Sequence, residues 1–257
     1  MTTPSKIVKY NLDKDKNVLG KDWLLTYGGY FSDEQNFKLF IKAVKPYLPK
    51  RNLDILYVAS ASGLLGEKLI NSLGRGRLTI VDASSKHLSE NKNPKTTKVC
   101  VDLLKMNLHK KFDLVIMRSS LDYFPSKKLQ IKVLKIIKKH LKKDGLFVNQ
   151  PAYIPNLDDR DTLSLAYNSS NKIGNRFFQS LDMVDIYKRA GFTAPQLIGR
   201  GKQMLLSDKD HIDRYKLDNS DIKRMQTILS KDRKAASVTK NGYRLKFEFP
   251  IFLSKSF

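Results

Sequence analysis

Short apolar runs alternate with amphipathic stretches through the middle of the chain. The runs are rich in Ile, Leu, Val and Phe, and they predict buried strands. These strands are expected at residues 54–59, 78–81, 98–101, 112–117 and 146–149. Between them, apolar residues recur at helical spacing at 66–73 and 126–143. Strands that alternate with helices predict an α/β fold, in which a parallel sheet carries helices on both faces.

The N-terminal segments follow a less regular pattern. Residues 1–20 are polar and predict a loose leader, and residues 21–31 (KDWLLTYGGYF) predict an aromatic loop or turn. A helix is expected from the capping residues Ser32-Asp33 as far as Pro46, because proline cannot continue a helix.

The C-terminal part changes character after the fifth predicted strand. We expect, in order, a polar loop, a helix, a sixth strand, a charged helix and a long strand. The ranges are 151–175, 180–191, 195–199, 208–234 and 243–254. Pro250 predicts a bend or a bulge in the last strand, because proline has no N–H for a sheet ladder.

Composition excludes several classes of protein. The chain has 257 residues of which 41% are hydrophobic, which is enough for a folded core, and it has no apolar run long enough to span a membrane. The polar residues 1–17 lack the apolar segment of a secretory signal. Cys100 is the single cysteine, so we expect a reducing, cytoplasmic setting. The four histidines are scattered, and no metal site is expected.

The net charge is unusually high. Lys and Arg number 48 against 25 Asp and Glu, which gives +23. Such a field favours polyanionic partners such as RNA. The excess is nevertheless spread along the whole chain without a basic tract, as a general bias in composition would produce. Charge alone therefore leaves RNA as one candidate partner.

A turn of small residues follows the first predicted strand. It comprises Ala59, Ser60, Ala61, Ser62 and Gly63. Small residues let a nucleotide-like ligand approach the backbone, and the next helix directs its N-terminal amides at that ligand. A tight turn chosen only for packing would have the same composition.

Carboxylates end the second and third predicted strands. Asp82 can accept both hydroxyls of a ribose, although it is also a plausible helix N-cap. Asp102 can accept an adenine amino group, and Leu103 can cover the ring. Because the carboxyl ends of parallel strands share one sheet edge, the two carboxylates and the small-residue turn predict an adenosine site.

These segments resemble motifs of class I S-adenosylmethionine-dependent methyltransferases. The run ILYVASASGLLGEKL is similar to the first motif, VDASSKHL to the second and VCVDLLKM to the third. FDLVIMRSSLDYF and LKKDGLFVN resemble the fourth and fifth strands with their loops. The resemblance covers about residues 50–150. It implies a Rossmann-like, doubly wound sheet of seven strands, mostly parallel with an antiparallel last strand, and S-adenosyl-L-methionine as cofactor.

The resemblance also implies a layout. We expect a single domain over 1–257, in which 1–48 cover the site, 50–150 bind the cofactor and 151–257 form the acceptor side, with a helical insertion at about 205–240. The expected cofactor-binding residues are Ala59, Ser60, Ala61, Gly63, Asp82, Ala83, Asp102, Leu103, Arg118 and Tyr30.

The first motif departs from the family pattern. Ala59 and Ala61 stand where the family usually has glycine, and only Gly63 is retained. Alanine disfavours positive φ, so either these positions have ordinary dihedral angles or the pocket is altered. The departure keeps a non-catalytic relative open as an alternative. A dinucleotide-binding protein is disfavoured, because G-x-G-x-x-G is missing.

Catalytic residues are hard to predict, because methyl transfer is an in-line displacement that mainly needs alignment. Tyr123 follows the fourth strand and is a candidate, as is His211, which could act as a general base. Packing would equally explain Tyr123, and pairing with Asp208 or Asp210 would explain His211. We expect a methyltransferase acting on a small molecule, and an RNA or protein methyltransferase is the alternative.

Overall fold

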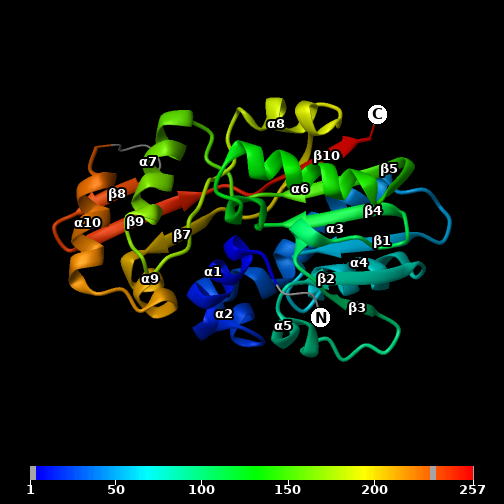
Figure 1. Cartoon of the computed structure of the whole chain (residues 1–257), viewed down its shortest axis with the longest axis horizontal. Coiled ribbons are helices and arrows are strands. Elements are labelled where there is room, and N and C mark those ends of the chain that lie inside the picture. The colour runs from blue at the N-terminus through cyan, green and yellow to red at the C-terminus, as the bar shows by residue number, and fades with distance from the viewer. Residues whose placement is uncertain (1–3, 232–235, 257) are drawn as a thin grey trace.

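A seven-stranded sheet forms the centre of the molecule in the computed structural model, which describes residues 4–231 and 236–256 (Figure 1). The strand order is β3-β2-β1-β4-β5-β10-β6. β10 pairs antiparallel with β5 and β6, whereas the other neighbours pair parallel. The strands are β1 (Asp54–Val58), β2 (Arg77–Asp82), β3 (Thr97–Cys100), β4 (Phe112–Arg118), β5 (Leu141–Gln150), β6 (Gln196–Arg200) and β10 (Pro250–Lys255). The predicted doubly wound α/β sheet with an antiparallel last strand is confirmed.

Helices cover both faces of this sheet, as the alternation of elements predicts. They are α3 (Glu34–Val44), α4 (Leu64–Leu73), α5 (Ser85–Ser89), α6 (Lys127–Lys139) and α8 (Met183–Ala190). Successive residues of β1 enter opposite layers: Ile55 packs with the apolar side of α3 and α4, whereas Leu56 packs with that of α6 and α8. Every residue of β1 and β4 is buried, which explains their continuous apolar runs.

A second, smaller sheet is a feature that the sequence pattern did not predict. In the described part of the chain it has three antiparallel strands, in the order β7-β9-β8, and three helices pack around it. Figure 1 shows this unit at the end of the molecule opposite β3. The elements are β7 (Met204–Ser207), β8 (Ala236–Thr239), β9 (Gly242–Phe247), α7 (Leu157–Asn168), α9 (Asp208–Tyr215) and α10 (Asn219–Leu229).

Three predictions for the C-terminal part are therefore wrong in detail. The predicted loop at 151–175 contains α7, which begins where the side chain of Asn156 accepts the amides of Asp158 and Asp159. The predicted helix at 208–234 is two helices, separated at Lys216 (φ 55°), and residues 232–234 lie outside the described chain.

The predicted strand at 243–254 is likewise two strands in different sheets. Pro250 begins the second of them, so the expected bend at this proline is real. The chain thus leaves the small sheet and enters the large one between β5 and β6 within a few residues.

The N-terminal segment is helical and not a loose leader. It forms α1 (Lys6–Lys14) and α2 (Asp22–Gly29), and α2 is kinked at Tyr27 and Gly28, where φ is 53° and 63°. The Asn11 side chain donates to the Tyr123 carbonyl, which ties α1 to the loop after β4. Short 3-10 turns complete the chain: η1 (Lys16–Val18), η2 (Tyr30–Ser32), η3 (Lys45–Tyr47), η4 (Leu103–Lys105) and η5 (Leu121–Tyr123).

Candidate cofactor and acceptor cavities

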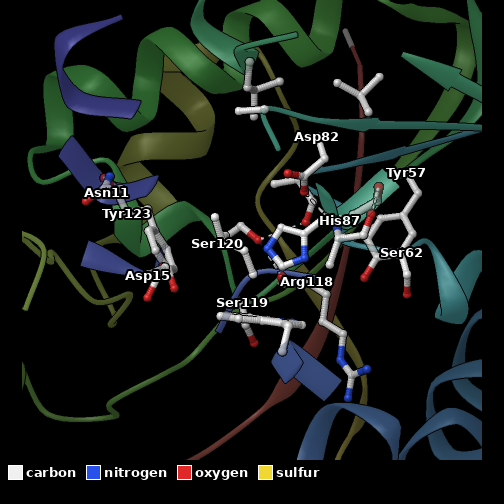
Figure 2. Close-up of a pocket in the computed structure, with 18 of the residues that line it drawn as sticks. Asn11, Asp15, Tyr57, Ser62, Asp82, His87, Arg118, Ser119, Ser120 and Tyr123 are labelled. Carbon is white, nitrogen blue, oxygen red and sulfur yellow. Dashed lines mark hydrogen bonds between the residues drawn. The ribbon is translucent and has the colours of Figure 1, made fainter. Parts of the chain in front are cut away.

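A cavity opens at the carboxyl ends of β1, β2 and β4, beside the switch in strand order (Figure 2). Its empty volume is about 1080 Å³, including the space at its mouth. The sheet contributes Ala59, Ser60, Ala61, Val81, Asp82, Ala83, Arg118, Ser119 and Ser120. Ligands of open α/β sheets bind at this edge, because the loops after neighbouring strands diverge there.

The turn after β1 keeps a left-handed backbone in spite of its alanines. The φ angles are 46° at Ala59, 49° at Ala61 and 77° at Gly63. Of the two alternatives, ordinary dihedral angles are thus wrong: alanine takes the conformation that glycine adopts without cost, at about 1–2 kcal/mol per residue. Gly63 does not line the cavity. A Cβ at this residue would lie 2.7 Å from the Ile80 side chain, so glycine is needed for packing against β2.

Asp82 lies at the tip of β2 and faces the cavity (Figure 2). One carboxylate oxygen accepts the Ala61 amide at 2.8 Å and the other accepts the Ser84 amide at 2.9 Å. Burial raises the pKa of this carboxyl. Ser84, and not Asp82, caps α5 by accepting the His87 amide. Each Asp82 oxygen still has a lone pair for a ribose hydroxyl.

Asp102 follows β3 as expected, but its side chain is not part of the cavity wall. Its two oxygens accept the amides of Ser5 and Leu104, at 2.7 and 2.8 Å, and the residue is buried. Its proposed contact with an adenine amino group stays a prediction. Leu103 does line the cavity, together with Val101, so an apolar surface for an aromatic ring is present.

Arg118 brings an uncompensated charge to the cavity. It is 6% exposed, and burial lowers its pKa. One nitrogen donates to the Phe31 carbonyl, whereas Nε and Nη2 have no hydrogen-bond partner among the described residues. No carboxylate in residues 4–231 and 236–256 forms an ion pair with it. Because a buried unpaired cation is costly, this residue is suited to an anionic ligand group.

The N-terminal segment closes the cavity from the opposite side. It contributes Val8, Asn11, Leu12, Asp15, Leu19, Trp23, Leu24 and Phe31. Tyr30, expected here, points elsewhere: its hydroxyl donates to the Lys202 carbonyl and its ring packs on Phe249. Its neighbour Phe31 occupies the cavity wall instead.

His87 is a cavity residue that the sequence analysis missed. Its Nδ1 accepts the Gly20 amide at 3.3 Å, and its ring lies edge-on to Trp23 with centroids 5.9 Å apart. Burial lowers its pKa, which favours the neutral ring. The one sequence signal that could have placed His87 in the cavity was its position in the second motif, shortly after Asp82.

A second cavity of about 400 Å³ adjoins the first on the side of the small sheet. Trp23, Phe31, Ser119 and Tyr123 line both cavities. The remaining walls are Tyr27, Asp122, Ala152, Tyr167, Arg176, Phe178, Met204, Leu206, Arg214, Tyr215, Phe247 and Phe249. Ser119 has φ 47° and a buried hydroxyl without a hydrogen-bond partner among the described residues, so a strained polar residue lies at the junction.

The structure separates the two catalytic candidates. Tyr123 lies at the junction, where its hydroxyl accepts a hydrogen bond from Arg214 at 2.9 Å, and burial raises its pKa. His211 lines neither cavity: it is fully buried, its Nδ1 contacts the Ser207 carbonyl and its Nε2 the Tyr167 hydroxyl. Burial lowers its pKa to about 4. The expectation of a general base is corrected, because Ser207 and Tyr167 engage both nitrogens, and neither Asp208 nor Asp210 is hydrogen-bonded to the ring.

The central part of the chain matches a known family. Residues 56–147 fit the sequence model of a methyltransferase domain, and they hold β2 to β4, most of β1 and β5, and most residues that line the first cavity. The core of this chain is a class I methyltransferase domain. The family implies S-adenosyl-L-methionine as its cofactor. No curated protein matches the chain.

Solved structures share the fold of this methyltransferase domain. The YcgJ protein of Bacillus subtilis is 14% identical, with a TM-score of 0.67 over 87% of this chain and 97% of that one. An S-adenosylmethionine-dependent methyltransferase of Clostridium acetobutylicum is 17% identical, with a TM-score of 0.52 over 90% and 96%. The N-methyltransferase NodS of Bradyrhizobium japonicum, solved with S-adenosylhomocysteine, is 11% identical, with a TM-score of 0.54 over 96% and 98%. At these identities the similarity shows the fold.

The described residues contain neither a cluster of metal ligands nor a helix that could span a membrane. Within 4–231 and 236–256 no three His, Cys, Asp or Glu side chains gather as a metal site would require. In the same residues no helix has the length and apolar character to cross a membrane.

Proposed function

We propose that this chain is an S-adenosyl-L-methionine-dependent methyltransferase whose acceptor is a small molecule held in the second cavity. The observation that carries the proposal is the contact between the two cavities, which share a wall at Trp23, Phe31, Ser119 and Tyr123. A methyl donor in the first cavity and an acceptor in the second would meet at that wall. Alignment of this kind is the main requirement of the reaction.

The residues of the first cavity fit the cofactor. Asp82 would accept the ribose hydroxyls, and the unpaired guanidinium of Arg118 would neutralise the carboxylate of the methionine part. Val101 and Leu103 offer an apolar surface to the adenine. When bound, the cofactor supplies an electrophilic methyl group.

The residues at the junction would position the acceptor and exclude water. Aromatic side chains form most of the shared wall, and the N-terminal helices close it from outside. Tyr123 keeps its proton on Oη at neutral pH, because burial raises its pKa, so it serves as a hydrogen-bond donor and not as a base. Ser119 offers a second hydroxyl there.

An RNA acceptor is the alternative that the charge of +23 favours. The burial of most residues that line the second cavity argues for a small molecule, since an RNA strand needs an open basic surface. The test is transfer of labelled methyl groups from S-adenosylmethionine to a panel of small carboxylates, amines and phenols, with bulk transfer RNA in parallel. We expect label in small molecules alone. Label in the RNA, with none in the panel, would contradict the small-molecule acceptor.

A further inference from the structure

Two arginines are buried in the wall of the second cavity. Arg176 comes from the segment between α7 and α8, and Arg214 from α9, and each is 3% exposed. The Nη1 of Arg176 and the Nε of Arg214 have no hydrogen-bond partner among the described residues. Each buried guanidinium therefore keeps a donor that only a ligand or water can satisfy.

The carboxylates nearby do not balance these charges. Arg214 pairs with Asp15 at 2.8 Å, whereas Arg176 has only Asp122, with the Nε and Oδ2 atoms 3.8 Å apart. Burial raises the pKa of Asp122. Burial also opposes charge on Asp15, but Arg214 and Arg176 outweigh it and hold the pKa of Asp15 below its usual value. Two buried cations thus line the second cavity, while the carboxylate that pairs closely with one of them, Asp15, lies in the wall of the first cavity.

Another buried arginine in the same half of the molecule, Arg160, is fully paired with carboxylates. Arg160 is 4% exposed and forms ion pairs with Asp161 and Asp182. It lines neither cavity and has no orphaned nitrogen among the described residues. Incomplete pairing is therefore a property of the cavity arginines and not of buried arginine in this protein.

Aromatic rings hold both guanidiniums in place. The Cζ of Arg176 lies 3.1 Å from the ring centroid of Tyr123, and that of Arg214 lies 4.3 Å from the ring of Trp23. Phe31, Phe178, Phe247 and Phe249 add further rings to the wall. A planar apolar body fits between such rings, while its anionic end reaches the guanidiniums.

We propose that Arg176 and Arg214 bind a carboxylate of the acceptor, and that the acceptor is a planar aromatic acid. The proposal rests on the proposed function, because it assigns the substrate class of the same site. The carboxylate would occupy the free donors of the two guanidiniums, with its ring toward the wall that both cavities share. Arginine matches carboxylates because its donors form a rigid fork.

The test is calorimetric titration of the full chain, loaded with S-adenosylhomocysteine, with benzoate and with benzamide. The two probes share a shape and differ in charge. We expect benzoate to bind at least about tenfold more tightly, since hydrogen bonds to an ionised group are about twice as strong as neutral ones. Equal affinity for the two probes, or no binding of benzoate, would overturn the proposal.

Two variants assign the effect to the cavity. Arg176→Gln should weaken benzoate binding at least about tenfold, whereas Arg160→Gln, at an equally buried but fully paired arginine, should leave it unchanged. Equal losses in both variants would indicate a general effect on folding and would count against the site. If the unmodified chain does not bind S-adenosylhomocysteine in the loading step, the proposed function itself fails.

Discussion

At the residue scale, the least expected finding is the left-handed alanine pair in the first motif. The sequence located the turn correctly, because its small residues and its position after a buried strand are local signals. It did not determine the backbone conformation, since alanine by itself disfavours positive φ. Contacts with β2 determine that conformation. Asp82 accepts a hydrogen bond from the Ala61 amide, and Gly63 packs closely on the Ile80 side chain.

Replacing Ala61 with glycine should stabilise the protein slightly. At φ 49° the change relieves about 1–2 kcal/mol of steric strain, while the extra freedom of the unfolded chain takes back about 0.4–1 kcal/mol. Ala43→Gly, in the regular helix α3, should lower the free energy of unfolding by about 1 kcal/mol. Urea denaturation measures both. Equal destabilisation by the two substitutions would show that Ala61 is not strained.

At the element scale, the N-terminal helices were the largest omission. Lysine-rich polar sequence predicts a loose leader, yet Val8, Asn11, Leu12 and Asp15 all face the cavity. The sequence holds no sign of this, because α1 is stabilised by contacts with residues about a hundred or more positions away, such as Tyr123 and Arg214. Helix α7 was missed in a similar way, since its burial depends on the small sheet that the pattern also failed to predict.

Removing the charge of Asp15 tests the anchoring of this segment. Asp15→Asn leaves the buried Arg214 without its closest carboxylate, so the free energy of unfolding should fall by roughly 3 kcal/mol. Asp13→Asn, at an exposed position of α1, the helix that Asp15 follows, should change it by less than about 0.5 kcal/mol. Urea denaturation of both variants gives the comparison. A similar small change in both would mean that the ion pair does not hold the N-terminal segment.

At the scale of the whole molecule, the large sheet was predictable and the small one was not. Continuous apolar runs are typical of a parallel sheet buried on both faces, and the motif resemblance added the seven strands with an antiparallel last one. Residues 204–231 and 236–247 build a second sheet, in which β8 and β9 form a hairpin but β7 pairs with β9 across two intervening helices. This sheet supplies Met204, Leu206 and Phe247 to the second cavity, and so to the proposed acceptor site.

The central claim is that the first cavity binds the cofactor through Asp82. Calorimetric titration with S-adenosylhomocysteine tests it on three proteins: the unmodified chain, Asp82→Asn, and Asp54→Asn. Asp54 is the matched control, because it is a buried carboxylate at the N-terminal end of β1, away from the cavity, and it pairs with Arg77. We expect micromolar binding by the unmodified chain and by Asp54→Asn, and an affinity at least about tenfold lower for Asp82→Asn, which loses its charge-assisted hydrogen bonds. No binding by the unmodified chain at millimolar ligand, or full affinity in Asp82→Asn, would contradict the claim.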